Sequence, residues 1–454
     1  MQPVVTVEEM AAVDAAARRH TPIEALIERA GAAVARRALA EMGGAYGRRV
    51  TVVAGKGHNG DDGRVAARLL ASRGARVDMV DPGARCRARF EQVDLVIDAA
   101  FGTGFRGTYD APETQAPVLA VDIPSGVDGN TGQAGDGAVS AEVTVTFAAW
   151  KPGLLLGRGA ALAGRVEVAD IGLDCSAAAA FLVGADDVVH RVPVRQRDTH
   201  KWKSALGVVA GAPGMMGAPM LCSEGGLRAG SGNVRLGVPG ADAAALPAGE
   251  AVGTGLPTGD WTAAALEWTE RCRAVVVGPG LGRADDTRAA VRRLVAETPH
   301  PVVVDADALH ALGEDAAEVI RSRRAGTVLT PHDGEFAALA GGPPGQDRMA
   351  AVRGLAERTG AVVLLKGSTT LVASPDGRVL ISASGTPRLA TAGSGDVLSG
   401  VVGALLAQGV EPQWAAALGA YVHGLASRRG PAVGLVAGEL PELVSGVLSD
   451  LVGA

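Results

Sequence analysis

Short apolar runs alternate with helix-like segments along almost the whole chain, and this alternation limits the possible folds more than any other feature. The runs are only strand-length, and polar or glycine-rich loops follow them. Strands buried on both faces of a parallel sheet have this pattern. The sequence therefore predicts an α/β fold with helices covering the sheet. The first series of predicted strands comprises residues 50–54, 77–80, 93–97, 118–121 and 143–147.

The strand pattern lapses from about Asp174 and begins again after Asp198. Since 454 residues are too many for one ordinary core, we expect two α/β domains, at residues 1–190 and 200–454. Two helices, near residues 397–408 and 413–427, are expected to close the chain. The second series of predicted strands comprises residues 206–210, 274–277, 302–304, 327–329 and 362–365, followed by a hairpin of 371–373 and 379–381.

A long helix is predicted from Thr21 to about Ala40. Thr21 is the expected N-cap, Pro22 lies in the first turn and Glu24 completes a capping box. The apolar residues repeat at helical spacing, which predicts one buried face. That face comprises Ile23, Leu26, Ile27, Ala30 and Val34.

Composition excludes several classes of function. The net charge is -6 and no basic tract is present, so binding to nucleic acid is not expected. The four cysteines form no CxxC pair, which argues against a zinc site or a disulfide framework and fits a reducing cytoplasm. No signal-peptide pattern or membrane-length apolar run is present, so we expect a soluble cytoplasmic protein. The cysteines are Cys86, Cys175, Cys222 and Cys272.

The first glycine-rich loop spans residues 55–63 and contains the pattern G-x-G-x-x-G between a strand and a helix. Asp81 ends the next strand, which completes a formal dinucleotide-binding fingerprint. Taken alone this signal is weak, because Asp61 and Asp62 would repel a phosphate unless a cation lay between them.

Two more polar loops follow apolar strands, at residues 98–104 and 122–128. Loops that follow parallel strands meet at the carboxyl edge of the sheet, where open α/β folds bind ligands. Asn59, Asp98, Asp122 and Ser125 should therefore converge there. Oxygen ligands from several loops suit a hard cation.

Residues 55–63, 98–107, 121–126 and 146–154 together resemble the NAD(P)H-hydrate epimerase domain. The resemblance implies a Rossmann-like three-layer sandwich and a potassium ion held by Asn59, Asp98 and Ser125. Asp122 matches a substrate contact, and we expect it to handle the proton during epimerisation; its alternative role is an orienting hydrogen bond to the Gly126 turn. The other expected substrate contacts are His58, Asn59, Gly60, Asp61, Gly102, Thr103, Gly104, Phe105, Arg106, Gly107 and Thr108.

The chain departs from this family at two positions. His58 stands where the family usually has an asparagine, and Asp61 replaces a small or amide residue. His58 can equally be a loop residue that hydrogen-bonds its neighbours. The departures put in question how tightly the loop holds its ligand.

The strongest local signal in the second half is residues 391–400, where glycines lead directly into a helix. Backbone N–H groups at such a helix start form an anion-binding site. Asp396 lies beside it, placed to accept a proton from an attacking hydroxyl during phosphoryl transfer, although a helix N-terminal acid is also common for structural reasons. Lys366 to Thr370 follow a strand and offer amides and hydroxyls to a nucleotide.

These segments resemble the ADP-dependent NAD(P)H-hydrate dehydratases, which have a ribokinase-like fold. By that resemblance Ala218, Gly280, His332 and Asp396 line the hydrate, and Mg²⁺ accompanies ADP. The implied function is metabolite repair: epimerisation of the R and S forms of NADHX or NADPHX, and dehydration of the S form to NAD(P)H with release of AMP and phosphate. The expected nucleotide-binding residues are Lys366, Gly367, Ser368, Thr369, Thr370 and Gly395.

Three alternatives stay open at the level of sequence. The Gly55 loop would also serve a nicotinamide-dependent dehydrogenase, and the Gly395-Asp396 loop a small-molecule kinase of the ribokinase-like class. The first domain could instead be a binding module without turnover. A homo-oligomer is expected from both resemblances.

Overall fold

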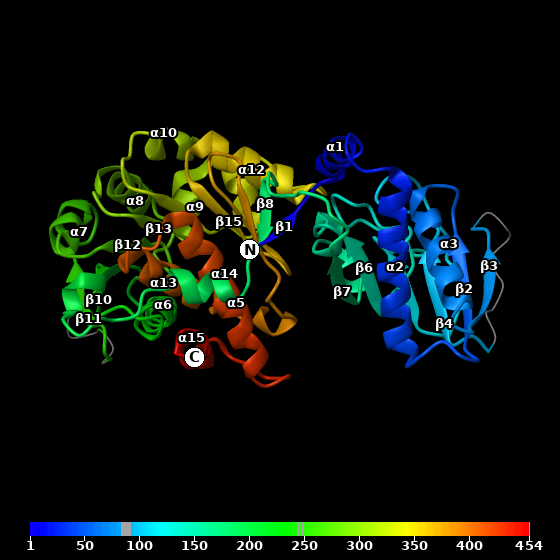
Figure 1. Ribbon diagram of the computed structural model, residues 1–454. Helices are drawn as coiled ribbons and strands as arrows, with labels where there is room; N and C mark the ends of the chain where they lie inside the picture. The colour runs from blue at the N-terminus through cyan, green and yellow to red at the C-terminus, as the bar shows by residue number, and fades with distance from the viewer. Residues whose placement is uncertain (83–91, 243–245, 247–248, 454) are drawn as a thin grey trace. The chain divides into compact units, whose positions relative to one another are not determined.

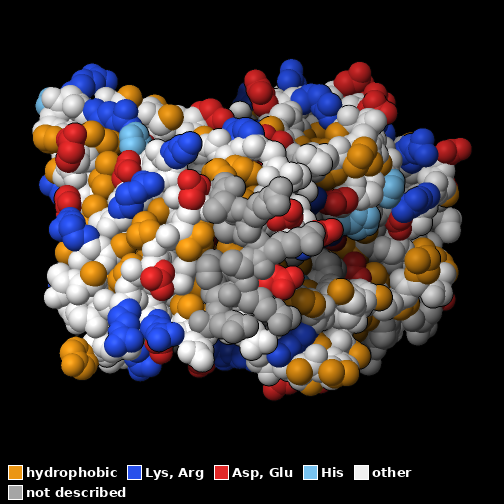
Figure 2. Space-filling model, turned by 90° about the vertical axis from the view of Figure 1, so that its right-hand side faces the viewer, with side chains coloured by type: hydrophobic (Ala, Val, Ile, Leu, Met, Phe, Trp, Pro, Cys, Tyr) orange, Lys and Arg blue, Asp and Glu red, His pale blue; other side chains and the backbone are white. Residues whose placement is uncertain are grey.

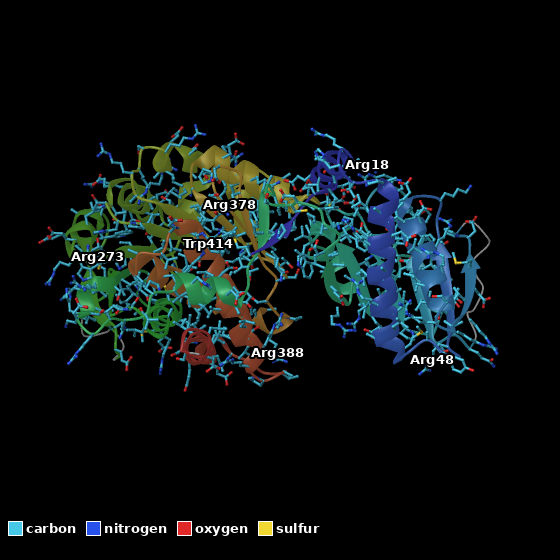
Figure 3. All side chains as sticks on the ribbon, viewed as in Figure 1. Arg18, Arg48, Arg273, Arg378, Arg388 and Trp414 are labelled. Carbon is cyan, nitrogen blue, oxygen red and sulfur yellow. The ribbon has the colours of Figure 1, made fainter. Side chains whose placement is uncertain are left out.

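The computed structural model describes residues 1–82, 92–242, 246 and 249–453 (Figure 1). The chain divides into two compact units, Gln2–Ala180 and Phe181–Ala454. The division comes earlier than the expected end of the first domain at residue 190, because α5 (Ala185–Arg191) belongs to the second unit. The guanidinium carbon of Arg191 lies 3.7 Å from the ring centroid of Trp414, a residue labelled in Figure 3, on α14 (Pro412–Arg429) of that unit.

The N-terminal unit is built on a parallel sheet with the strand order β3-β2-β4-β5-β6-β7. Two long helices, α2 and α3, pack against each other on one face of it. The elements are β1 (Gln2–Val4), α1 (Val7–Ala17), α2 (Ile23–Met42), β2 (Arg49–Ala54), α3 (His58–Ala71), β3 (Arg76–Val80), β4 (Leu95–Ala99), β5 (Val118–Val121), β6 (Val143–Phe147), α4 (Gly159–Leu162) and β7 (Arg165–Ala169).

Both faces of this sheet are buried. Val52 and Ile97 point to the face covered by α2 and α3, whereas their neighbours Val53 and Val96 belong to a second apolar cluster with Tyr109. Side chains alternate between the two faces of a strand, so strands buried on both sides must be apolar throughout. This is why the strands appear in the sequence as continuous apolar runs.

The strand order changes direction between β2 and β4. The chain first steps from β2 to β3 at one edge and then returns to the other side of β2. The loops that follow β2 and β4 therefore separate at this point and leave a crevice at the carboxyl edge, which is the usual ligand position in such folds. The Gly55 loop and the Asp98 segment lie at this place.

The C-terminal unit has a larger sheet with the strand order β8-β17-β16-β15-β14-β13-β12-β9-β10-β11. Strands β9 to β15 pair in parallel, and β15, β16 and β17 pair in antiparallel. The strands are β8 (Ala180–Leu182), β9 (Ala205–Val209), β10 (Asn233–Pro239), β11 (Val252–Leu256), β12 (Ala274–Val277), β13 (Val302–Val304), β14 (Thr327–Leu329), β15 (Val362–Leu365), β16 (Thr370–Ala373) and β17 (Val379–Ser382).

A large apolar core in this unit forms between the sheet and the buried faces of helices α6, α13 and α14. Its strand order reverses between β12 and β9, so a second crevice is expected at the carboxyl edge there. Besides α5 and α14, the helices are α6 (Gly217–Arg228), α7 (Thr262–Thr269), α8 (Asp285–Glu297), α9 (Asp307–Leu312), α10 (Ala316–Ile320), α11 (Asp333–Ala340), α12 (Arg348–Thr359), α13 (Ser394–Ala407) and α15 (Leu440–Val452).

The structure corrects two details of the predicted elements. Helix α2 begins at Ile23 with Pro22 as its N-cap residue, and no side chain caps it, so the predicted capping by Thr21 is wrong. The chain closes with three helices rather than two, since α15 follows α14. Leu26, Ala30 and Val34 are buried on α2 as predicted.

Three features of the structure relate to the expectation of a soluble protein in a reducing compartment. Cys175, Cys222 and Cys272 are free and buried, whereas Cys86 lies outside the described residues. Among the described residues, no helix combines the length and the apolar character that crossing a membrane requires. Acidic and basic side chains are interspersed over the face drawn in Figure 2.

Candidate active sites

The first candidate site begins at the N-terminus of α3. Gly57 is the N-cap residue, so His58, Asn59 and Gly60 form the first helical turn and not a loop. A Cβ atom on Gly60 would lie 2.0 Å from the carbonyl oxygen of Gly55, and one on Gly63 would lie 2.5 Å from the Cβ of Ala99. The glycines therefore let the helix start close against the ends of β2 and β4.

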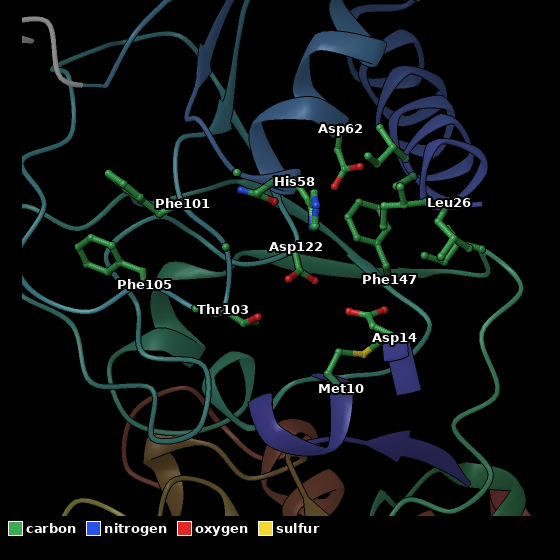
Figure 4. A pocket seen from close by; sticks show the side chains of 18 of the residues that line it. Met10, Asp14, Leu26, His58, Asp62, Phe101, Thr103, Phe105, Asp122 and Phe147 are labelled. Atoms are coloured by element: carbon green, nitrogen blue, oxygen red, sulfur yellow. The ribbon is translucent and has the colours of Figure 1, made fainter. Parts of the chain in front are cut away.

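A cavity of about 550 Å³ opens beside this helix start (Figure 4). Its walls come from α1, α2, the start of α3 and the loops after β4, β5 and β6. One side is apolar, with Leu26 and Phe147, and the opposite side is formed by Phe101, Thr103 and Phe105. The ionisable side chains that line it are Asp14, Arg18, Lys56, His58, Asp62, Asp122 and Lys151.

Asp122 is held at the cavity wall by Lys151. The ammonium nitrogen of Lys151 lies 2.7 Å from Oδ1 of Asp122, and the hydroxyl of Thr146 donates to the same oxygen at 3.0 Å. Lys151 is 1% exposed. Asp122 has a φ of 66°, a left-handed conformation that is uncommon for a residue other than glycine and concentrates at functional sites. These contacts replace the hydrogen bond to the Gly126 turn that was the alternative role for Asp122.

Asn59 lines the cavity, whereas Asp98 and Ser125 are buried outside its lining. Ser125 donates to both oxygens of Asp98, through its hydroxyl at 2.7 Å and its amide at 2.8 Å. Burial raises the pKa of Asp98 to about 6 although these hydrogen bonds lower it. Phe101 donates to the Ser125 hydroxyl, and a Cβ atom on its neighbour Gly102 would lie 3.4 Å from the Cβ of Asn59.

The side-chain amide of Asn59 is buried, and neither its oxygen nor its nitrogen has a hydrogen-bond partner among the described residues. A buried polar group without a partner is costly unless something in the functional state satisfies it. An unsatisfied amide oxygen, a buried carboxyl and a serine hydroxyl are the kinds of ligand that a hard cation takes. The three residues expected to hold potassium are thus compatible with it.

The other predicted substrate contacts divide into two groups. His58 and Gly102 to Phe105 line the cavity. Asp61 does not, since its carboxylate forms an ion pair with Arg64 at 3.0 Å. Gly60, Arg106, Gly107 and Thr108 also lie outside the lining, and the last three are exposed.

The second candidate site is formed at the start of α13. Gly393 is its N-cap residue with a φ of 91°, and Asp396 lies in the first turn. A Cβ atom on Gly395 would lie 3.4 Å from the ammonium nitrogen of Lys366. Burial, followed by the charge of Asp305, raises the pKa of Asp396 to about 6. The base, the helix N-terminus and the cation predicted from sequence are therefore brought together.

Lys366 forms a buried ion pair with Asp305. Its ammonium nitrogen lies 2.7 Å from Oδ1 of Asp305 and 3.9 Å from Oε2 of Glu335. Burial alone would lower the pKa of Lys366, but the two carboxylates outweigh it and raise that pKa. The pKa of Asp305 is lowered because Lys366 more than offsets the effect of burial. Both groups are charged at neutral pH.

His332 is the N-cap residue of α11. Its Nδ1 accepts hydrogen bonds from the amides of Gly334 at 3.0 Å and Glu335 at 3.3 Å. A neutral ring with Nδ1 as acceptor carries its proton on Nε2. The side chain is 60% exposed, so it can both cap the helix and contact a ligand.

Gly280 and Ala218 meet at the strand-order reversal of the second sheet. A Cβ atom on Gly280 would lie 3.4 Å from the Cβ of Ala218. Gly280 has a φ of 68°, which favours glycine there. Gly367 and Ser368 are exposed after β15, whereas Thr369 is buried and Thr370 begins β16.

Two family models match the chain. Residues 206–447 match the family described as NAD(P)H-hydrate dehydratase, and residues 23–92 and 80–153 match the one described as YjeF-related protein N-terminus. The protein named bifunctional NAD(P)H-hydrate repair enzyme Nnr from Mycobacterium tuberculosis (strain ATCC 25618 / H37Rv) is 40% identical over 450 residues, which cover 92% of each chain. The chain belongs to the bifunctional NAD(P)H-hydrate repair enzyme family. The resemblances stated from the sequence are confirmed.

Other members of this repair-enzyme family and two solved structures agree. The Nnr protein of Moorella thermoacetica is 35% identical over 514 residues, covering 99% of this chain and 97% of that protein. An ADP/ATP-dependent NAD(P)H-hydrate dehydratase from Bacillus subtilis, co-crystallised with ATP and Mg²⁺, has 27% identity and a TM-score of 0.50 over 59% of this chain and 97% of that one. A ribokinase-like superfamily protein from Enterococcus faecalis, 21% identical with a TM-score of 0.53 over 61% of this chain and 98% of that one, confirms the fold.

Sequence reasoning missed several polar residues at the two sites of this repair enzyme. Lys151 was not among the predicted site residues. Lys366 was predicted as a nucleotide contact, but nothing local in the sequence showed that it pairs with Asp305. Asp305 lies 61 positions from Lys366, so their contact depends on the sheet order. His423 on α14 is 5% exposed, and burial, with the charge of Lys366, lowers its pKa to about 4.

Proposed function

We propose that this chain repairs hydrated nicotinamide nucleotides. Its N-terminal unit interconverts the R and S forms of NADHX and NADPHX, and its C-terminal unit dehydrates the S form with ADP. The observation that carries the proposal is the cluster of Asp396, Lys366 and the α13 N-terminus, which supplies a base, a cation and an anion site together. The family membership of the whole chain supports both halves.

Dehydration needs a better leaving group than hydroxide. Asp396 takes the proton of the C6 hydroxyl while that oxygen attacks the β-phosphorus of ADP, and the bond to the AMP oxygen breaks. The amides at the start of α13 and the ammonium of Lys366 bear the charge that develops on the phosphoryl oxygens. Phosphate then leaves C6, assisted by the lone pair of the ring nitrogen, and loss of a C5 proton restores NAD(P)H.

Nucleotide binding is assigned to Lys366, Gly367, Ser368, Thr369, Thr370 and Gly395. Gly367 and Ser368 are exposed and directly follow Lys366, which supports this role. Ala218, Gly280 and His332 are assigned to the hydrate, as the strand-order reversal supports. Magnesium enters with the nucleotide, where it neutralises phosphate charge; the Bacillus subtilis structure was obtained with ATP and Mg²⁺.

Epimerisation inverts C6, a carbon bonded to both a hydroxyl and the ring nitrogen. Asp122 accepts the hydroxyl proton, and Lys151 holds its carboxylate in place at 2.7 Å. The assigned substrate contacts are His58, Asn59, Gly60, Asp61 and Gly102 to Thr108, of which His58, Asn59 and Gly102 to Phe105 line the cavity.

Potassium is assigned to Asn59, Asp98 and Ser125. When bound, it supplies positive charge beside the substrate. The unpartnered amide of Asn59 supports the assignment. We further propose that the protein is a cytoplasmic homo-oligomer; the free thiols of Cys175, Cys222 and Cys272 support a reducing compartment.

One assay tests the proposal. The full chain is mixed with both epimers of NADH hydrate, ADP and Mg²⁺, and absorbance of the dihydronicotinamide is followed. We expect complete recovery of NADH, faster than spontaneous epimerisation. Recovery of one epimer alone at enzymatic speed contradicts the epimerase half. Steady consumption of ATP with a sugar or vitamin precursor, without NADH recovery, would instead identify a kinase.

A further inference from the structure

We propose that Asp62 is a second catalytic residue of the N-terminal site and gives a proton to the ring nitrogen while Asp122 takes one from the C6 hydroxyl. This role rests on the proposed epimerase function. It adds an acid to a site in which Asp122 alone could serve only as the base.

Asp62 is placed to reach a ligand in the cavity. It lies on α3, one turn after Asn59, and lines the cavity wall. In Figure 4 its carboxyl points from α3 towards the ring of His58. The residue is 7% exposed, and Leu26 and Ile27 of α2 line the same region.

Asp62 has no fixed partner. Within the described parts of the chain, no side chain or amide donates a hydrogen bond to its carboxyl, and no cation forms an ion pair with it. The lysine of the cavity that is buried, Lys151, is already bound to Asp122 and Thr146. A buried carboxyl that serves only the fold normally has its hydrogen bonds satisfied.

The surrounding charges favour a protonated Asp62. Negative groups face it from three elements: Asp14 on α1, Asp61 on α3 and Asp122 after β5. The cationic or titratable side chains around the cavity are Arg18, Lys56, His58 and Lys151. Burial first, and then these carboxylates, raise the pKa of Asp62 to about 8.

Asp62 and Asp122, two of the three carboxyl groups that line this cavity, therefore have opposite environments. Asp122 has a cation at 2.7 Å and a hydroxyl donor, whereas Asp62 has an apolar surrounding and like charges. Two titratable groups that differ in this way are suited to act as base and acid. Both residues line the cavity that would hold the hydrated ring.

The step balances without a redox partner. As the carboxylate of Asp122 takes the hydroxyl proton, the bond between C6 and the ring nitrogen breaks and Asp62 gives its proton to that nitrogen. The product is an open-chain aldehyde, which turns about the C5–C6 bond. The nitrogen then attacks the other face of the aldehyde carbon and returns its proton to Asp62, while Asp122 returns the other proton to the oxygen.

The test compares full-length wild type with Asp62→Asn, Asp62→Glu and Asp78→Asn. Asp78 is exposed on β3 and serves as the control. We measure epimerisation of NADH hydrate between pH 5.5 and pH 10. Asp62→Asn should lower kcat by about 100-fold with a smaller change in KM, and Asp62→Glu should recover part of the rate. Wild type should lose activity above pH 8, as Asp62 ionises, and Asp62→Asn should lack that decline.

Each result has a defined meaning. A wild-type rate no faster than the spontaneous one overturns the epimerase function and this role with it. An active wild type with an unimpaired Asp62→Asn variant overturns the role alone. A wild-type profile that stays flat to pH 10 also overturns the role, even if the variants do not fold. Dehydration of the S epimer by each variant should match wild type and reports that the C-terminal unit is folded.

Discussion

The ammonium nitrogen of Lys366 lies 2.7 Å from Oδ1 of Asp305, and the hydroxyl of Ser399 donates to the other oxygen at the same distance. The Asp305 side chain is 2% exposed. The contact joins the end of β13 to the loop after β15 and the second turn of α13. It places the ammonium of Lys366 against a buried carboxylate, with a second carboxylate, that of Glu335, 3.9 Å away.

Removal of Lys366 should therefore destabilise the C-terminal unit. Lys366→Met leaves Asp305 buried without its cation, and we expect the free energy of unfolding to fall by about 3–5 kcal/mol. ADP binding should weaken as well. Urea denaturation and titration calorimetry measure the two effects. Asp305→Asn added to this variant should restore part of the stability.

The matched control for Lys366→Met is Lys203→Met. Lys203 is 47% exposed and pairs with Asp198 at 3.4 Å. Exposed ion pairs contribute about 0–1 kcal/mol, so this variant should behave like wild type. An equal loss of unfolding free energy in the two lysine variants would refute the structural importance of the buried ion pair.

Asp396→Asn should abolish most dehydration and leave ADP binding largely intact. Loss of a general base costs about 100-fold to 10,000-fold in rate. Glu357→Gln, an exposed change on α12, is the control and should keep full activity. Steady-state rates with the S epimer decide the matter, and retained turnover in Asp396→Asn would rule out this base.

The pH dependence of dehydration by the wild-type protein gives a second measurement on Asp396. Asp396 must be ionised to accept a proton, and its pKa is raised to about 6. The kcat/KM for dehydration should therefore fall as pH decreases below about 6. A profile that continues level to pH 4.5 would contradict the assignment.

Much of the fold could be predicted because most of the buried strands carry their own signal. Buried parallel strands such as β5 and β12 are apolar runs with glycine or proline nearby, and their predicted bounds match the structure. Strands β7 and β11 were not predicted, since exposed or half-exposed residues interrupt them. Their place comes from pairing with a neighbour, which no short segment reveals.

The sites could be predicted only where one loop carries the chemistry. The residues of the Gly393–Asp396 segment are consecutive in the chain, and the sequence predicted their anion site and base. The ion pairs of Asp122 with Lys151 and of Asp305 with Lys366 join residues 29 and 61 positions apart. The start of α3 was placed too late, because glycines that suggest a loop here allow a helix to contact a sheet.

Asp122→Asn should slow epimerisation without changing dehydration. The amide cannot accept the hydroxyl proton, so we expect a loss of about 100-fold in kcat. Glu142→Gln, an exposed change next to β6, is the control. Epimerisation of the purified S form without ADP measures the effect, and an unchanged rate would remove Asp122 from the mechanism.

Potassium should stabilise the wild-type N-terminal unit. A ligand that binds only the folded state raises the melting temperature with its concentration. We expect the first thermal transition to rise with KCl more than with choline chloride at equal ionic strength, and Asn59→Ala to lose this difference. An identical response of wild type to the two salts would contradict a potassium site at Asn59, Asp98 and Ser125.

Asp62→Asn should change how the stability of the N-terminal unit depends on pH. The pKa of Asp62 is raised to about 8 in the folded protein, against about 3.9 for an aspartate in an unfolded chain. Between these values the folded state keeps a proton that the unfolded state releases. Stability therefore falls as pH rises through this window, and the full loss is reached above about pH 8.

Asparagine does not ionise, so the variant escapes this loss. Its melting temperature should be close to that of wild type at pH 4 and higher at pH 9, with the difference growing in between. Differential scanning calorimetry at pH 4, 6, 8 and 9 measures it, with Asp78→Asn as the exposed control. A variant less stable than wild type by the same amount at every pH would show instead that the Asp62 carboxyl has a structural partner, and would argue against its role as the acid.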